Sequence, residues 1–194
     1  SEQDATHQHR YKADESYIVG RGRKPVDAYL AIDEILDVAE RSGAEAIHPG
    51  YGFLSENAQF AAACRARGIA FIGPRADVIR TLGDKVAARL VAEQAGVPTV
   101  PGLTLDLTTE SALEQARAFC AANAPIIVKA AHGGGGRGMR VVERLDQLAE
   151  AVERARSEAR AAFGNPQVFL EKYLPRVRHI EVQILGDLTG QIVH

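Results

Sequence analysis

An apolar run that carries one lysine, followed by a glycine-rich loop and a second apolar run, most constrains how this chain folds. It covers residues 125–142 and reads PIIVKAAHGGGGRGMRVV. Lys129 lies within the first run, where a charge is costly to bury without an anionic partner. Glycine takes the positive φ angles that such a loop needs and lets backbone N–H groups approach phosphate oxygens. The pattern predicts a strand, a loop and a second strand that together bind phosphate.

The glycine spacing includes G-x-G-x-x-G at Gly133, Gly135 and Gly138, but two known nucleotide motifs lack their context here. A dinucleotide-binding fingerprint needs a helix after its glycines, whereas residues 139–143 read as a strand. A Walker P-loop needs a Lys-Ser or Lys-Thr pair after its last glycine, and none follows. A hairpin that folds over a triphosphate remains, and the alternative is an exposed turn with surplus glycine.

Composition narrows the function classes. The 194 residues are 46% hydrophobic and 25% charged, which predicts a globular chain with one large domain or two small ones. A net charge of −2 and 6% aromatic residues argue against a nucleic-acid partner. Cys64 and Cys120 have no metal-ligand spacing and predict a reducing compartment. No run approaches the roughly 18 apolar residues of a membrane span, and no signal peptide is recognised, so we expect a soluble, intracellular chain.

Both ends of the chain are abrupt. Ser1 opens a polar stretch without an initiator methionine, and His194 ends within the apolar run 191–194. These features predict a fragment of a longer protein.

The first half alternates helical and extended patterns, which is typical of a parallel α/β sheet. A proline-flanked extended segment then predicts a linker between domains. The expected elements are a helix at 26–41, a strand at 46–48, a helix at 57–67, a strand at 69–72, two short helices within 75–96 and the linker at 97–102.

The second half predicts a small α+β unit around the glycine hairpin, with helices at 110–122 and 145–162 and a strand at 168–173. Residues 179–185 alternate between apolar and polar side chains, which predicts a last strand with His179 on its polar face. A lone strand histidine is more often structural than functional.

Three further segments combine residues that suit a ligand. Residues 48–57, HPGYGFLSEN, follow a predicted strand and present Tyr51 between two glycines, where a binding loop and a tight turn are equally good interpretations. Lys85 follows Asp84, a predicted N-cap, so its cation opposes the helix dipole unless a phosphate binds there; a solvent-facing lysine is the alternative. Residues 171–174 end a strand and could offer backbone groups to an adenine edge.

Five motifs in this order resemble the biotin carboxylase domain of biotin-dependent carboxylases, which are ATP-grasp enzymes. They are HPGYGFLSEN at 48–57, LGDK at 82–85, IIVKAAHGGGGRGMRVV at 126–142, FLEKY at 169–173 and RHIEVQILGD at 178–187. Within this family, the segments at 9–15 and 25–30 are more similar to pyruvate carboxylases than to acyl-CoA carboxylases.

The resemblance implies an α/β fold in four parts. These are the C-terminal part of a Rossmann-like pre-ATP-grasp domain at 1–74, a helical linker at 75–102, an α+β ATP-grasp lid subdomain at 103–173, and the start of the second ATP-grasp subdomain at 174–194.

It also implies roles for individual residues. Lys85 and Lys129 would contact ATP phosphates, with Gly135 and Gly136 in the loop above them. Glu171, Lys172, Tyr173 and Leu174 would hold the adenine, His179 would lie near the nucleotide, and Tyr51 with Gly52 would lie near the biotin ring.

The implied reaction uses ATP, Mg²⁺ and bicarbonate. Carboxyphosphate forms and carboxylates biotin on a biotinylated carrier domain, and pyruvate carboxylases then pass the carboxyl group to pyruvate, giving oxaloacetate. The family's magnesium-binding glutamates and catalytic arginine are expected after His194. We therefore expect no catalytic or metal-binding residue in these 194 residues, and no activity of the chain alone.

Other interpretations stay open. The chain could belong to a biotin carboxylase subunit of acetyl-CoA or propionyl-CoA carboxylase, or to a non-catalytic nucleotide-binding module that keeps the fold. More distant ATP-grasp ligases share the lid, but residues 48–57 count against them. The resemblance implies a homo-oligomer, and the abundance of alanine and arginine favours a bacterial, cytoplasmic protein.

Overall fold

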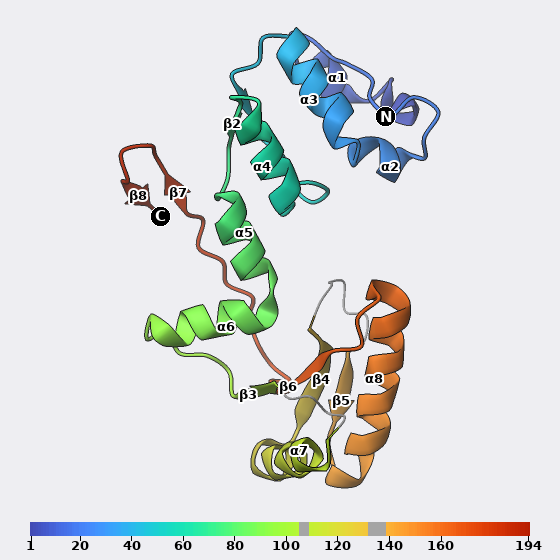
Figure 1. Cartoon of the computed structure of the whole chain (residues 1–194), viewed down its shortest axis with the longest axis vertical. Coiled ribbons are helices and arrows are strands. Elements are labelled where there is room, and N and C mark those ends of the chain that lie inside the picture. The colour runs from blue at the N-terminus through green and yellow to red at the C-terminus, as the bar shows by residue number, and fades with distance from the viewer. Residues whose placement is uncertain (105–108, 132–138) are drawn as a thin grey trace. The chain divides into compact units, whose positions relative to one another are not determined.

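The computed structural model describes residues 1–104, 109–131 and 139–194, which form two compact units (Figure 1). Unit 1 is Ser1–Pro98 and unit 2 is Thr99–His194. Each unit combines helices with strands and has a hydrophobic core of its own. Each is therefore described by itself.

Unit 1 consists mainly of short helices. Its two strands, β1 and β2, pair in parallel, with Ala46 opposite Ala70 and Ile47 opposite Phe71, as the helix–strand alternation predicts. Its elements are η1 (Glu2–Asp4), α1 (Gln8–Tyr11), α2 (Pro25–Tyr29), α3 (Ile32–Arg41), β1 (Ala46–Ile47), α4 (Ala58–Ala66), β2 (Ala70–Phe71), α5 (Ala76–Gly83) and α6 (Lys85–Gln94).

The core of unit 1 lies between α3, α4 and the two strands. The rings of Phe60 and Phe71 meet edge to face, with centroids 5.9 Å apart. Arg67, which ends α4, reaches α3 through Asp37 at 2.6 Å and Glu40 at 3.2 Å. The buried side chains of this core are Leu36, Ala39, Leu54, Phe60, Cys64 and Ile69.

The helix predicted over 26–41 is two helices, so this prediction is wrong at its centre. The chain leaves the helical conformation at Ala31, whose ψ is 74°, and α3 then begins. The break allows Ala28 and Ala31 both to be buried, at 0% and 5% exposure. Gly20 packs against this point so closely that a Cβ on it would lie 2.4 Å from Ala28. Neither glycine nor proline marks the break, so the local sequence carries no signal for it.

Asp4 connects the N-terminal segment to α2. Its carboxylate accepts hydrogen bonds from Ser1 Oγ at 2.6 Å and from Tyr29 Oη at 2.5 Å, and His7 Nδ1 lies 3.2 Å away. The hydrogen bonds from Ser1 and Tyr29 lower the pKa of Asp4 from 3.8 to about 2, with a smaller contribution from the charge of His7. The folded chain therefore favours the ionised carboxylate.

Unit 2 contains a four-stranded antiparallel sheet in the order β3-β6-β4-β5 and a separate pair, β7 with β8. The two strands predicted to flank the glycine loop are confirmed as β4 and β5. The elements are β3 (Gly102–Thr104), α7 (Glu110–Asn123), β4 (Ile126–Ala130), β5 (Arg140–Val142), η2 (Leu145–Gln147), α8 (Leu148–Phe163), β6 (Val168–Lys172), β7 (Leu185–Gly186) and β8 (Ile192–Val193).

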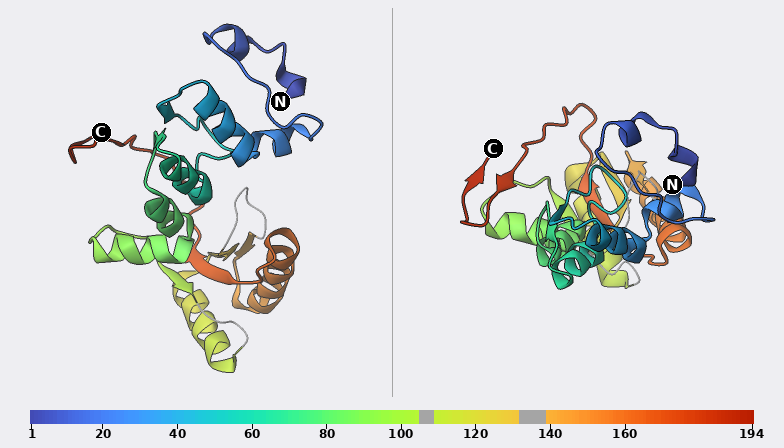
Figure 2. Two further views of the ribbon diagram at one scale, coloured as in Figure 1. Left: turned by 45° about the horizontal axis from the view of Figure 1, so that its top comes forward. Right: turned by 90° about the horizontal axis from the view of Figure 1, so that it is seen from above.

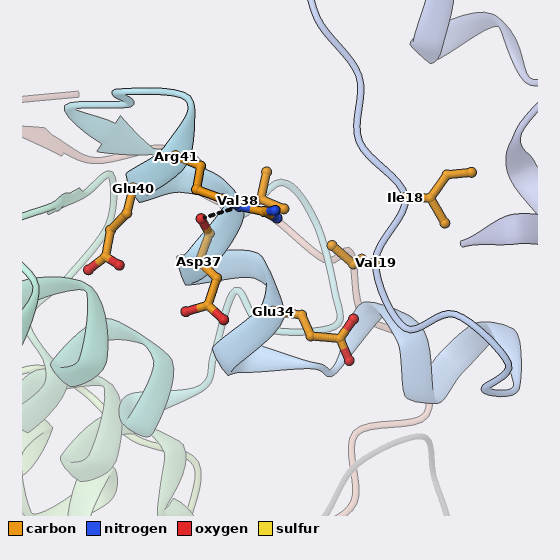
Figure 3. Close-up of a pocket in the computed structure, with 7 residues that line it drawn as sticks. All are labelled: Ile18, Val19, Glu34, Asp37, Val38, Glu40 and Arg41. Atoms are coloured by element: carbon orange, nitrogen blue, oxygen red, sulfur yellow. Dashed lines mark hydrogen bonds between the residues drawn. The ribbon is translucent and has the colours of Figure 1, made fainter.

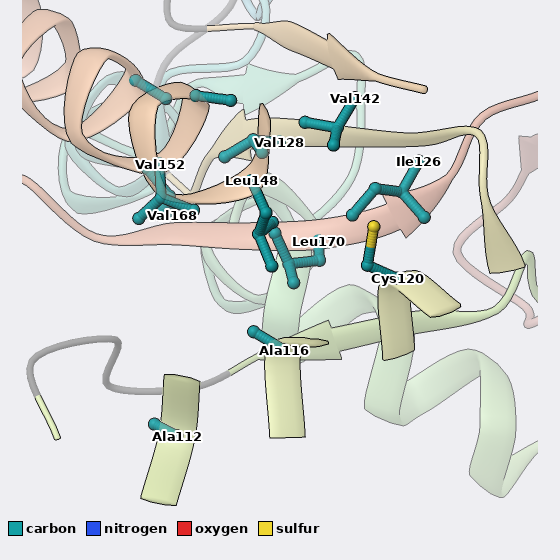
Figure 4. Close-up of a cluster of buried hydrophobic side chains, with 12 residues drawn as sticks. Ala112, Ala116, Cys120, Ile126, Val128, Val142, Leu148, Val152, Val168 and Leu170 are labelled. Atoms are coloured by element: carbon teal, nitrogen blue, oxygen red, sulfur yellow. The ribbon is translucent and has the colours of Figure 1, made fainter. Parts of the chain in front are cut away.

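Helix α8 runs alongside this sheet (Figure 2), and the core lies between α7, α8 and the strands (Figure 4). Small side chains let the helices approach closely, and the larger ones come from the strands and from α8. The buried cluster is Ala112, Ala116, Cys120, Ile126, Val128, Val142, Leu148, Ala151, Val152, Ala155, Val168 and Leu170.

The strand predicted at 179–185 is wrong over residues 179–184. Ile180, Val182 and Ile184 are 71%, 64% and 57% exposed, and pairing starts at Leu185. A strand needs a neighbour for its N–H and C=O groups, and the described part of the chain offers none beside 179–184. The alternation of apolar and polar side chains at 179–185 is therefore not enough to predict a paired strand, and residues 179–184 are all exposed.

Leu170→Ala should lower the free energy of unfolding of unit 2 by about 2–5 kcal/mol, because Leu170 is 1% exposed and its removal leaves a cavity. The matched control is Leu188→Ala, which changes a fully exposed leucine and should cost less than about 0.5 kcal/mol. Urea denaturation followed by circular dichroism measures both. Equal losses in the two variants would contradict the core assignment.

Acid should remove the contribution of Asp4. Because its folded pKa lies below 3.8, its contacts stabilise the chain above that pH and are lost as the pH falls towards about 2. We expect wild type to be more stable than Asp4→Asn near neutral pH, and the gap to close between about pH 4 and pH 2. Urea denaturation at each pH tests this, with Asp14→Asn as the control for losing one carboxylate. A gap that stays constant with pH would refute the assignment.

Candidate functional site

The register between β4 and β6 brings Lys129 and Glu171 together. Lys129 lies opposite Phe169 and Glu171 lies opposite Ile127, so the charged residues are diagonal neighbours on one face. Lys129 Nζ donates a hydrogen bond to Glu171 Oε2. The two side chains are 27% and 21% exposed, so they form a partly buried ion pair.

We call the sheet face that carries Ile127, Lys129, Phe169 and Glu171 the site face. Helices α7 and α8 cover the opposite face. Ile127 and Phe169 are 6% and 7% exposed, and Lys129 Nζ lies 6.0 Å from the centroid of the Phe169 ring. Apolar side chains beside a few charged groups are typical of small-molecule sites.

Sequence reasoning missed Ile127 and Phe169. The signal was present, because side chains two positions apart in a strand share a face. Ile127 is two positions before Lys129, and Phe169 is two positions before Glu171. What the sequence lacked was the pairing of the two strands.

The anionic partner of Lys129 in this structure is a carboxylate. The lysine was expected to need a phosphate because of its apolar surroundings, and Glu171 already meets that need. An ammonium group carries three N–H donors, so two remain for a ligand. Glu171 thus fixes the position of the amine and occupies only one of its three N–H donors.

The backbone at 171–174 is partly engaged. Lys172 N donates to Pro101 O, and Tyr173 N donates to Pro125 O, both at 2.8 Å. Among the described residues, Leu174 N has no hydrogen-bond acceptor. Unlike the N–H groups of Lys172 and Tyr173, the N–H group of Leu174 is therefore open to the predicted contact with an adenine edge, which stays a prediction.

His179 lies on the extended segment after β6. Its side chain is 85% exposed, and its Nε2 is 3.4 Å from Glu181 Oε1. In the described part of the chain, this histidine makes no contact with Lys129 or Glu171.

The glycines of the predicted phosphate loop, Gly133, Gly135, Gly136 and Gly138, lie outside the described residues. Strand β5, which follows these residues in the chain, is linked to α8 by an ion pair in which Arg140 Nη2 donates to Glu158 Oε1.

In unit 1, Asp84 is the N-cap of α6, as predicted. Its Oδ1 accepts hydrogen bonds from Val86 N at 2.9 Å and Ala87 N at 3.1 Å. Lys85 is exposed in the first turn of this helix.

The turn at 48–57 presents Tyr51 and Gly52 to solvent, and Tyr51 is 99% exposed. His48 Nδ1 accepts a hydrogen bond from Gly50 N at 3.0 Å, so the histidine stabilises the turn locally. Gly50 and Gly52 have φ of 72° and 73°, and Phe53 has φ of 45°. Local structure therefore accounts for His48 and leaves Tyr51 available.

A cavity of about 340 Å³ lies in unit 1, beside α3 (Figure 3). Its carboxylates already have partners: Glu34 binds Gly20 N and Arg23, while Asp37 and Glu40 bind Arg67. We assign it no ligand. The residues that line it are Ile18, Val19, Glu34, Asp37, Val38, Glu40 and Arg41.

No group of three or more His, Cys, Asp or Glu side chains within the described ranges could hold a metal ion. None of the helices described here is both long and apolar enough to cross a membrane.

Two family models match consecutive parts of the chain. The biotin carboxylase N-terminal domain matches residues 1–79, and the ATP-binding domain of the carbamoyl-phosphate synthase L chain matches residues 84–194.

Relatives of known identity agree with these matches. Pyruvate carboxylase of Bacillus subtilis is 54% identical over 195 residues, which cover 100% of this chain and 17% of that protein. The biotin carboxylase–β-γ-ATP complex from Campylobacter jejuni is 43% identical, with a TM-score of 0.87 over 100% of this chain and 43% of that chain. The biotin carboxylase domain dimer of Hydrogenobacter thermophilus 2-oxoglutarate carboxylase, in complex with MgADP, ADP and bicarbonate, is 43% identical, with a TM-score of 0.85 over 100% of this chain and 42% of that chain.

The chain thus spans only a part of each of these relatives. Its motifs, its mixed helix and sheet structure and its family matches all indicate the same family. The resemblance to the biotin carboxylase domain is confirmed: the chain belongs to the biotin carboxylase family, with a biotin carboxylase N-terminal domain followed by an ATP-binding domain.

Proposed function

We propose that this chain binds ATP as part of a protein that carboxylates biotin with bicarbonate, and that the protein is a pyruvate carboxylase. The family membership and the identity to a pyruvate carboxylase support the activity. The observation that carries the site is the Lys129–Glu171 pair next to Ile127 and Phe169 on the site face.

The site face suits a nucleotide because it combines two kinds of surface. The buried side chains of Ile127 and Phe169 form the apolar floor of the site face beside Lys129, and the amine of Lys129 can neutralise phosphate. Leu174 N, which follows β6 and has no acceptor among the described residues, can hydrogen-bond to the edge of the base. Base and phosphates are thereby recognised by different residues of one sheet.

Phosphoryl transfer depends mainly on positioning and on neutralising charge. ATP supplies the phosphoryl group when it is bound. Glu171 holds the amine of Lys129 in place, and the two remaining N–H donors of that amine bind phosphate oxygens. A cation whose position is set beforehand needs little rearrangement when the ligand arrives.

The remaining site residues keep the roles that the family resemblance implies. Lys85 would contact phosphate, Gly135 and Gly136 would cover it, and His179 would lie near the nucleotide. Lys172 and Tyr173 would flank the adenine through their backbone, and Tyr51 with Gly52 would contact the biotin ring. The exposure of Tyr51 supports its availability to a ligand.

Among the described residues, no group of three or more His, Cys, Asp or Glu side chains could hold a metal ion. We therefore assign no step through Mg²⁺ to them, and ligands after His194 remain a prediction. Biotin is proposed to arrive on a separate carrier domain. The complete protein is proposed to form a homo-oligomer; the related carboxylase domain of Hydrogenobacter thermophilus is a dimer.

The finer description of the fold is also a proposal: a Rossmann-like part at 1–74, a linker at 75–102, a lid at 103–173 and the start of a second subdomain at 174–194. We propose a cytoplasmic location. Cys64 and Cys120 are free and buried, and burial raises the pKa of both thiols, which suits structural cysteines in a reducing compartment.

Calorimetric titration of the chain with Mg-ATP tests the phosphate contact. Lys129→Ala should weaken binding by on the order of 1.5–3 kcal/mol, because a charge-assisted hydrogen bond is lost. The exposed lysine variant Lys24→Ala is the matched control and should bind like wild type. Since Lys129→Ala also leaves Glu171 without its cation, the double variant Lys129→Ala/Glu171→Gln separates the lost contact from repulsion between carboxylate and phosphate.

If both folded variants bind Mg-ATP as tightly as wild type, Lys129 has no role at the phosphates. If only the single variant is weakened, Lys129 acts by neutralising Glu171 and not by contacting the ligand.

A further inference from the structure

Phe53 has a backbone conformation that a side chain of its size rarely adopts. Its φ is 45°, in the left-handed region, and it is the one residue other than glycine with positive φ in the described part of the chain. A Cβ in this conformation crowds the following carbonyl oxygen, so bulky residues are true outliers there. Such a conformation persists only where surrounding contacts enforce it.

One side of Phe53 is held by the core and by the following helix. Leu54 is 4% exposed within the unit 1 core, and Ser55 N donates to Gly52 O at 2.9 Å. Asn57 Oδ1 accepts from Phe60 N at 2.9 Å and so fixes the start of α4. These contacts fix the path of the backbone from Leu54 to the start of α4.

The other contact comes from Tyr29, at the end of α2. The rings of Tyr29 and Phe53 have centroids 5.1 Å apart and planes inclined by 37°. Tyr29 is itself held, because its hydroxyl donates to Asp4 at 2.5 Å and Asp4 also accepts from Ser1 Oγ. The Phe53 side chain is still 58% exposed, and the Tyr29 ring packs against it.

Tyr51 lies two residues before Phe53 and is 99% exposed. Among the described residues, its side chain makes no hydrogen bond or ring contact. The direction in which it points is therefore set by the backbone of the turn, and the backbone of the turn depends on Phe53.

We propose that Tyr29 is a positioning residue: its ring holds Phe53 in the left-handed conformation, and this fixes Tyr51 and Gly52 for contact with a planar cyclic urea such as the ring of biotin. Tyr29 acts through Phe53 and does not touch the ligand. The ligand class rests on the proposed function, whereas the mechanical coupling between Tyr29 and the turn does not.

Hydrogen exchange in the full-length protein tests the coupling. In Tyr29→Leu the amides of residues 52–55 should exchange at least about 10-fold faster than in wild type, because the turn loses its ring contact. Tyr29→Phe keeps the ring but loses the hydrogen bond to Asp4, so its exchange should lie between that of wild type and that of Tyr29→Leu. If Tyr29→Leu does not fold, Phe53→Leu removes the same ring contact from the exposed side and should give the same increase.

A double-mutant cycle separates coupling from general destabilisation. Phe53→Gly takes a positive φ without help from a neighbouring ring. In that background, adding Tyr29→Leu should change the exchange of residues 52–55 by less than about 3-fold. An equally large increase in both backgrounds would overturn the proposal, as would no increase in either.

Kinetics with free biotin test the consequence for the ligand. In Tyr29→Leu we expect the KM for free biotin to rise about 5- to 10-fold, with the KM for ATP within about 2-fold of wild type. A parallel rise of both values would overturn the selective role of Tyr29. If wild-type protein carboxylates neither free biotin nor biotin on its carrier domain, the proposed function fails, while the exchange data still decide whether Tyr29 holds the turn.

Discussion

The Lys129–Glu171 ion pair depends on a single strand register, and unit 2 is organised around that register. Strand β6 lies between β3 and β4, and its side chains alternate between the core and the site face. A shift of one residue would turn Glu171 towards α7 and α8 and would take Leu170 out of the core. Apolar packing on one face of the sheet therefore determines where a charged pair lies on the other. The core and the candidate site are two results of the same pairing.

Much of this fold could be predicted where its causes act over a few residues. The two strands around the glycine loop combine apolar side chains with short lengths, and both are present as β4 and β5. The start of α6 was visible in the sequence because Asp84 is followed by amides that its carboxylate can cap. Helix α4 follows Asn57 for the same reason. In each case the residues that determine the element lie within it or directly before it in the sequence.

What could not be predicted depends on contacts between distant segments. The break between α2 and α3 is stabilised by Gly20 against Ala28, which no local pattern reveals. The apolar surroundings of Lys129 correctly indicated an anionic partner, but Glu171 becomes that partner only through strand pairing. Phe53 lies between residues typical of a turn, yet its own side chain argues against a positive φ. Its conformation is explained once the Tyr29 ring is found beside it.

In the proposed ATP site, the carboxylate partner of Lys129 would have opposing effects on a bound triphosphate. Glu171 would add a negative charge near the phosphates, which would weaken binding by repulsion. It also keeps the ammonium at a defined place in a partly buried site, where an unpaired charge would be costly. Because lysine has three donors, holding one with Glu171 leaves two for the ligand. In the proposed site the pair would therefore give up some affinity and gain a cation that is already in position when the nucleotide binds, and positioning is what phosphoryl transfer most requires.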